Sequence, residues 1–163
     1  LDTHLVYTEL EVPKLLEELA AKGHDILVEE QITGREATVG VIEGVRNESL
    51  YILPVVEIVP PTERDFFDYD AKYTGVTEDI CPGRFSDDEK QAMQAIAKTV
   101  HEALGLSHYS RSDFIVKDGV PYFLEVNTLP GLTTQSLLPK ATEAIGMTYD
   151  ELIDHLVSTA TPH

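Results

Sequence analysis

Two strand-like segments joined by a short turn constrain the fold of this chain more than any other feature. Residues 110–116 and 123–127 are both rich in aromatic and β-branched side chains. Between them, Lys117, Asp118 and Gly119 form a turn signal, because an Asp-Gly pair favours the tight turns of hairpins. The pattern therefore predicts an antiparallel hairpin.

Each of these segments carries two polar residues spaced two positions apart. They are Arg111 and Asp113 in the first segment, and Glu125 and Asn127 in the second. Residues two apart on a strand lie on the same face. Carboxylate and amide oxygens are hard ligands that suit Mg²⁺, and a buried Glu125 would be costly without an ion. The alternative is a solvated polar face that binds nothing.

The length of the hairpin loop decides whether the two acids share a face. A two-residue loop would place Asp113 opposite Leu124, with Glu125 on the other side of the sheet. An odd loop, such as three residues with Gly119 in a left-handed conformation, brings all four polar residues to one face. We predict this odd loop or a bulge with the same effect. The apolar neighbours on the second strand are expected to be buried: Phe123, Leu124 and Val126.

Several motifs in a fixed order resemble the C-terminal half of a D-alanine:D-alanine ligase of the ATP-grasp superfamily. They are ILVEEQITGRE at residues 26–36, FFDYDAKYT at 66–74, RSDF, LEVNTLPG and SLLPKA. The resemblance runs from about residue 26 to residue 157. Each motif is weak alone, but their shared order makes chance agreement unlikely.

The resemblance implies an α+β fold, the ATP-grasp C-terminal subdomain, with a mostly antiparallel sheet and helices packed on one face. Residues 1–163 would be one C-terminal part of an ATP-grasp domain. The chain begins at Leu1 without an initiator methionine. We therefore expect the N-terminal substrate domain and the first part of the nucleotide site to be absent, and the isolated chain to lack ligase activity.

Local patterns predict the remaining elements. Pro13 and Gly23 bound a short amphipathic helix, and the spacing of Ser86 and Glu89 predicts a capping box that opens a helix ending near Gly105. A helix or helical turn is also expected after Ser136, and Thr148 with Glu151 is expected to cap a last helix. Strands are expected at residues 26–30, 36–42 and 51–59, the last interrupted by Pro54, followed by a long loop over 60–85.

Charge and composition restrict the classes of partner. The chain has 29 acidic residues against 12 Lys and Arg, a net charge of −17. Such a field repels nucleic acid, which needs a basic surface. No apolar run approaches the ~18 residues that a membrane span needs. The single Cys81 excludes an internal disulfide, which fits a reducing cytoplasm.

The resemblance assigns nucleotide-binding roles to several residues. Glu29 would end a strand at the hinge between the lobes of the nucleotide site, and the backbone at Gln31 and Ile32 would face adenine. Glu36 would accept the ribose hydroxyls. The alternative for these residues is an acidic strand end in solvent.

The long loop would complete this site. By the same resemblance, Lys72 reaches the nucleotide phosphates and Tyr73 belongs to a lid that protects an acyl phosphate from water. The alternative is a solvated loop.

The resemblance also assigns the chemistry to the hairpin and its turn. Asp113, Glu125 and Asn127 match metal ligands for two Mg²⁺ ions, with Mn²⁺ as a substitute, and Glu125 would serve both ions. Arg111 would stabilise the oxyanion of a tetrahedral intermediate, helped by the backbone N–H of Gly131. An ion pair of Arg111 with Asp113 or Glu125 is the alternative, and both can hold.

The segment after the Pro-Gly turn resembles the site of the second amino acid. Ser136 and the first N–H groups of a helix would bind its carboxylate. The alternative, that Ser136 is only an N-cap, stays open.

The implied function is ATP- and Mg²⁺-dependent ligation of two D-alanines through an acyl phosphate, for peptidoglycan synthesis in cell wall biogenesis. The partners would be D-alanine, ATP and the remainder of the same ligase, which the resemblance suggests is a homodimer, without nucleic acid or membrane. Two alternatives are another ATP-grasp carboxylate-amine ligase and a non-catalytic Mg-nucleotide binding module.

Overall fold

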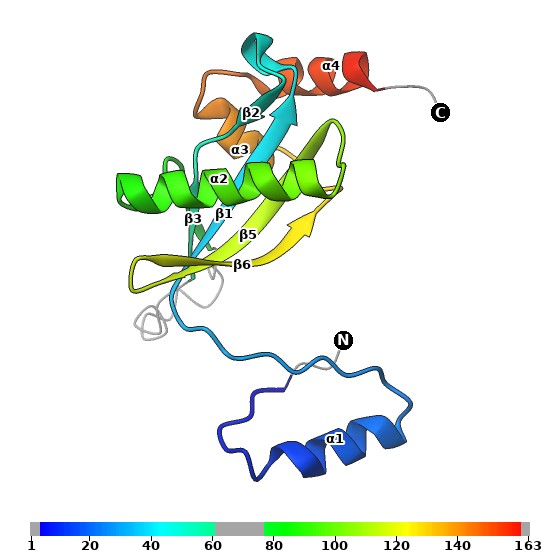
Figure 1. Cartoon of the computed structure of the whole chain (residues 1–163). Coiled ribbons are helices and arrows are strands. Elements are labelled where there is room, and N and C mark those ends of the chain that lie inside the picture. The colour runs from blue at the N-terminus through cyan, green and yellow to red at the C-terminus, as the bar shows by residue number, and fades with distance from the viewer. Residues whose placement is uncertain (1–3, 61–76, 161–163) are drawn as a thin grey trace, which may run out of the picture. The chain divides into compact units, whose positions relative to one another are not determined.

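The computed structural model of the chain describes residues 4–60 and 77–160 (Figure 1). The chain divides into two compact units, Leu1–Gln31 and Ile32–His163. Within the described ranges, no helix is long and apolar enough to cross a membrane.

In the described part of the first unit, residues 4–31, there is one helix, α1, at Val12–Ala21. A proline stands in its first turn and Gly23 follows it with a φ of +78°, so the predicted helix and its terminator are confirmed. The predicted strand at residues 26–30 is wrong, since residues 24–33 form no strand. Leu27 is 79% exposed, and no strand described in the structure pairs with this segment. A strand without a hydrogen-bonded partner is not stable in water.

The second unit is built on one antiparallel sheet in the order β4-β3-β1-β5-β6, with β2 also paired to β1. The strands are β1 at Arg35–Glu43, β2 at Leu50–Ile52, β3 at Val56–Val59, β4 at Glu78–Ile80, β5 at Tyr109–Lys117 and β6 at Val120–Asn127. This architecture confirms the predicted α+β class.

Two expectations about strands need correction. The strand predicted at 51–59 is split around Pro54 into β2 and β3, and both parts pair with β1. Proline cannot donate a ladder hydrogen bond, which explains the interruption. The region predicted as a continuous loop to residue 85 contains the short strand β4.

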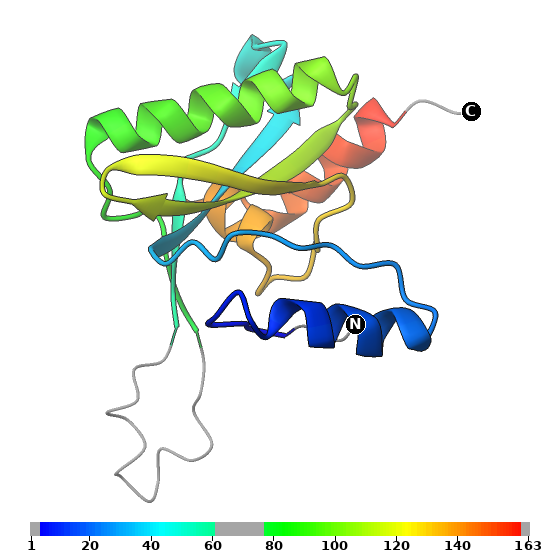
Figure 2. The ribbon, with the colours of Figure 1, turned by 60° about the horizontal axis from the view of Figure 1, so that its bottom comes forward.

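Helices cover both faces of the sheet, so the expectation of helices on one face is wrong. Figure 1 shows α2 (Asp87–Ala103) crossing in front of the sheet with α3 (Leu137–Glu143) behind it, and Figure 2 shows the sheet between α2 and the pair α3 and α4 (Tyr149–Thr159). The physical reason lies in β1, whose residues from 37 to 42 are all buried. A strand that is apolar on both faces needs cover on both.

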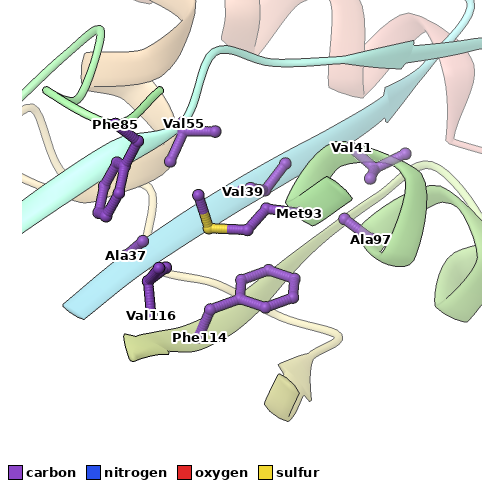
Figure 3. Packing of buried hydrophobic residues seen from close by; sticks show 9 residues of the cluster. All are labelled: Ala37, Val39, Val41, Val55, Phe85, Met93, Ala97, Phe114 and Val116. Atoms are coloured by element: carbon purple, nitrogen blue, oxygen red, sulfur yellow. The ribbon is translucent and has the colours of Figure 1, made fainter. Parts of the chain in front are cut away.

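Two apolar clusters result from this arrangement. Under α2, Met93 and Ala97 pack on side chains from β1 and β5 (Figure 3). On the opposite face, side chains of α3 and α4 pack on β1 and on the segment before β3: the buried members are Ile42, Val45, Leu53, Val56, Leu138, Ala141 and Leu152. The second cluster fixes α3 against the sheet.

Both predicted capping boxes are confirmed. Ser86 accepts a hydrogen bond from the backbone N–H of Glu89, whose carboxylate accepts the N–H of Ser86 at 2.7 Å. Thr148 and Glu151 repeat this arrangement at the start of α4. In each case the reciprocal bonds satisfy two backbone donors that a helix start leaves free.

Gly40 allows α3 to approach the sheet closely. A Cβ atom at this buried position of β1 would lie 2.5 Å from Cδ1 of Leu138 and 2.7 Å from Cδ1 of Leu53. Overpacking of this kind costs about 1–3 kcal/mol, and the lower chain entropy of alanine offsets about 0.4–1 kcal/mol. We expect Gly40→Ala to lower the free energy of unfolding in urea by about 1 kcal/mol.

A double-mutant cycle tests the cause of this loss. If the new methyl group clashes with Leu138, then Leu138→Ala should cost less in the Gly40→Ala background than in the wild type. Additive free energies would show that the clash is not with Leu138.

Candidate functional site

The hairpin between β5 and β6 turns through a two-residue loop. Lys117 pairs with Val120, which leaves Asp118 and Gly119 as the loop residues, with φ values of +52° and +80°. Positive φ at both positions is the geometry of a type I′ turn. The predicted three-residue loop is therefore wrong.

With an even loop alone, Asp113 and Glu125 would lie on opposite faces of the hairpin, but a β-bulge brings them to the same face. Phe114 pairs with Phe123, but the next pair along the hairpin is Asp113 with Glu125, so Leu124 has no partner on β5. The extra residue shifts the register by one position. Asp113 and Glu125 consequently lie directly opposite each other on one face, which confirms the bulge that was the other half of the prediction.

The four polar residues of the hairpin share this face. Arg111 pairs with Asn127 one step beyond the pair of Asp113 and Glu125. β6 is at one edge of the described sheet, and Glu125 is exposed. The edge position also explains why Phe123 and Leu124, predicted to be buried, are exposed, and why Val126 is only partly buried.

Arg111 and Asp113 form a bidentate ion pair. Nε and Nη2 of Arg111 donate to Oδ1 and Oδ2 of Asp113 at 2.9 and 2.8 Å. Hydrogen bonding to Asp113 raises the pKa of Arg111 above its ordinary value, and the negative charges of Asp113 and Glu125 add to this. The ion pair named as an alternative is therefore present, and it leaves the guanidinium beside both acids.

A buried threonine also binds Asp113, and sequence reasoning missed it. Oγ1 of Thr38, directly opposite Asp113 on β1, lies 2.6 Å from Oδ1 of the carboxylate. The signal was present, because Thr38 is the one hydroxyl-bearing residue in the buried part of β1.

The oxygen atoms of this face suit a hard cation. Asp113 and Glu125 supply carboxylates, while Oδ1 of Asn127 accepts the backbone N–H of Leu129 at 3.0 Å. Among the described residues, no three His, Cys, Asp or Glu side chains form a cluster that could hold a metal ion. The predicted set is two carboxylates and an amide, and this donor chemistry fits Mg²⁺. A cation would share Asp113 with Arg111.

Gly131 and Ser136 lie close together in the segment between β6 and α3. A Cβ atom on Gly131 would come within 2.9 Å of Oγ of Ser136. This hydroxyl contacts Oγ1 of Thr133 at 2.8 Å and accepts the Thr133 N–H at 3.2 Å. Ser136 occupies the N-cap position of α3, but its side chain makes no capping bond. The simple N-cap interpretation is therefore wrong for the hydroxyl.

Two further contacts that the sequence did not indicate hold this region. The hydroxyl of Tyr149 donates to the carbonyl of Leu132 at 2.9 Å, next to Gly131. Nζ of Lys140 on α3 donates to Asp79 on β4 at 2.6 Å. Both contacts join residues far apart in the sequence, which explains why no local pattern indicated them.

Of the residues assigned to the nucleotide, Glu36 lies on the sheet that carries the acids. Glu36 is exposed on β1, two positions before Thr38, and therefore on the same sheet face as Asp113. Glu29 and Gln31 are exposed in the first unit, and Ile32 begins the second. Lys72 and Tyr73 lie outside the described residues.

The family profile described as D-ala D-ala ligase C-terminus matches residues 3–158 of the chain. The chain belongs to this family. A D-alanine--D-alanine ligase of Flavobacterium johnsoniae is 40% identical over 152 residues, which are 93% of this chain and 46% of that relative. The similarity to this family therefore extends over nearly all of the chain.

Solved structures agree with this assignment. The D-alanine--D-alanine ligase of Bacillus anthracis complexed with ATP has a TM-score of 0.73 and 30% identity, over 94% of this chain and 47% of that one. The VanG D-Ala:D-Ser ligase of Enterococcus faecalis has a TM-score of 0.71 and 32% identity, over 93% of this chain and 43% of that one. The chain spans about half the length of these family members.

Proposed function

We propose that this chain is the half of an ATP-dependent ligase that binds the metal, the nucleotide and the second substrate, and that the ligase joins two D-alanines through an acyl phosphate. The observation that carries the proposal is the bulge at Leu124, which brings Arg111, Asp113, Glu125 and Asn127 to one face. The family match and the ATP complex of the Bacillus anthracis relative support a nucleotide-dependent ligase. The product would serve peptidoglycan synthesis.

The hairpin residues would handle charge during phosphoryl transfer. Asp113, Glu125 and Asn127 would hold Mg²⁺, two ions in our proposal, which neutralises the charge on the triphosphate. Arg111 would stabilise the oxyanion formed when the second amine attacks, together with the N–H of Gly131. The position of the Arg111 guanidinium beside the acids, where it pairs with Asp113, supports this role.

The other proposed contacts place the substrates. Ser136 would bind the carboxylate of the second D-alanine, which its position beside Gly131 supports. Glu36 would accept the ribose hydroxyls, on the same sheet face as the acids. The remaining nucleotide contacts proposed from the resemblance involve Glu29, Gln31, Ile32, Lys72 and, in the lid, Tyr73.

The likeness to VanG favours a second candidate, a ligase whose second substrate is D-serine. That relative is a D-Ala:D-Ser ligase by name and has 32% identity, between the 30% and the 35% found for two structures of the Bacillus anthracis ligase. The side chains that the hairpin contributes to this face, Arg111, Asp113, Glu125 and Asn127, would serve both reactions. The identity of the second substrate therefore has to be measured.

A substrate panel on the full-length protein tests the proposed function. With Mg-ATP and D-alanine, we expect phosphate release and a D-alanyl-D-alanine product detected by mass spectrometry. D-Serine, D-lactate and L-alanine, each offered with D-alanine, are the competing second substrates. Preference for D-serine would establish the second candidate, whereas no phosphate release with any D-amino acid would contradict both.

A further inference from the structure

Thr38 is completely buried and contacts the carboxylate of Asp113, which also accepts two hydrogen bonds from Arg111. It is 1% exposed and lies on β1 directly opposite Asp113. Its Oγ1 is 2.6 Å from Oδ1 of Asp113 and 3.0 Å from the carbonyl oxygen of Ser112. A hydroxyl has one proton to donate. The shorter contact is to the charged acceptor, where hydrogen bonds are stronger.

The two donors that bind Asp113 differ in how firmly they are held. Arg111 reaches the carboxylate from the same strand with a long side chain that is 18% exposed. Thr38 reaches it from the neighbouring strand with a short, buried and β-branched side chain, whose χ1 angle has few alternatives. Thr38 therefore provides the more rigid contact.

Oδ1 and Oδ2 of Asp113 are consequently not equivalent. Oδ1 receives both Thr38 and Nε of Arg111, whereas Oδ2 receives only Nη2 of Arg111. Fixing Oδ1 from β1 also fixes the plane of the carboxylate. Oδ2 is then the oxygen with more remaining capacity to accept another ligand.

We propose that Thr38 is a positioning residue that fixes the carboxylate of Asp113 and leaves Oδ2 as the oxygen that would bind a cation. The purpose of this positioning rests on the proposed function, but the orientation itself does not. If Arg111 released the carboxylate to bind an oxyanion, the contact from Thr38 would still hold Asp113. Outer contacts of this kind typically change metal affinity by about 10–100-fold.

The test compares two substitutions at Thr38 with a matched control. Thr38→Val keeps the shape but removes the hydroxyl, and Thr38→Ser keeps the hydroxyl. Thr142→Val is the control, since Thr142 is equally buried and its hydroxyl donates to the carbonyl of Pro139 on α3 at 2.8 Å, away from the acids. Each protein is measured in its full-length form.

The readouts are the affinity for Mn²⁺ in the presence of ADP, followed by electron paramagnetic resonance, and the melting temperature. We expect Thr38→Val to weaken Mn²⁺ binding by about 10–100-fold, with Thr38→Ser and Thr142→Val within about threefold of the wild type. Equal Mn²⁺ affinity in Thr38→Val and wild type would overturn the proposal, whatever the melting temperatures.

A crystal structure of Thr38→Val separates this inference from the proposed function. If the wild type itself binds no Mn²⁺ with ADP, the proposed function fails, and the orientation of Asp113 then decides the inference. A rotated carboxylate in the variant would support positioning by Thr38. An unchanged carboxylate would show that Arg111 alone orients it.

Discussion

Glu125→Gln is expected to lower kcat/KM of the full-length ligase by at least about 100-fold, the scale of losing one charge-stabilising group in an active site. Glutamine has the same shape but no negative charge, so a divalent cation loses an anionic ligand. Glu125 is exposed on the edge strand, and no hydrogen bond to its side chain is found among the described residues. The folded state should therefore keep its stability, within about 0.5 kcal/mol.

The measurement combines steady-state phosphate release with urea denaturation and calorimetry of Mg-ADP binding. Glu102→Gln is the matched control, because Glu102 is an exposed glutamate on α2, on the opposite face of the sheet. We expect the control to match the wild type in all three measurements. Full activity of Glu125→Gln would contradict the metal role of Glu125. Equal losses of kcat/KM in Glu125→Gln and Glu102→Gln would show that the effect comes from the change in net charge.

The second large effect concerns Glu57, a buried acid on β3 that binds two arginines. Its side chain is 6% exposed. Oε1 accepts Nη2 of Arg35 at 2.9 Å, and Oε2 accepts both Nε and the backbone N–H of Arg84 at 2.9 Å. The Arg35 guanidinium also lies 4.0 Å from the ring centre of Phe85. The cluster ties the start of β1 to β3 and to the segment after β4.

These contacts lower the pKa of Glu57. Burial alone would raise it, but hydrogen bonds from the side chain and backbone of Arg84 and from Arg35 outweigh burial and bring the pKa from 4.5 to about 2. A difference of this size corresponds to about 3 kcal/mol of stability at neutral pH. Because both guanidinium groups are partly exposed, screening by solvent reduces the value, and we expect Glu57→Gln to cost about 2 kcal/mol.

The sign of the pH dependence follows from the lowered pKa. The folded state favours the ionised acid, so the contribution of Glu57 is fully present above about pH 4.5 and is lost as the pH falls toward 2. Urea denaturation gives the free energy of unfolding of the wild type and of Glu57→Gln between pH 7 and pH 3. The difference between the two should be constant down to about pH 4.5 and should shrink at lower pH. The exposed Glu48→Gln serves as the control. A difference that stays constant down to pH 3 would contradict the assigned pKa.

The sequence by itself determined the features that depend on neighbours along the chain. Both capping boxes and the hairpin were predicted correctly, because each depends on residues within a few positions of one another. The order of the motifs also indicated the family that the profile match shows. Arg111 and Asp113 are two positions apart on one strand, and Glu125 and Asn127 are two apart on the other. This spacing specified one polar face on each strand.

Tertiary structure alone decided how these local pieces meet. The turn is even, so only the unpaired Leu124 brings the two acids to the same face, and a bulge depends on packing across strands. Thr38 binds Asp113 across 75 positions of sequence, and α3 covers the face opposite α2 because β1 is buried on both sides. Local propensity sets which face a side chain takes on its own strand, whereas register and burial set which residues stand opposite it.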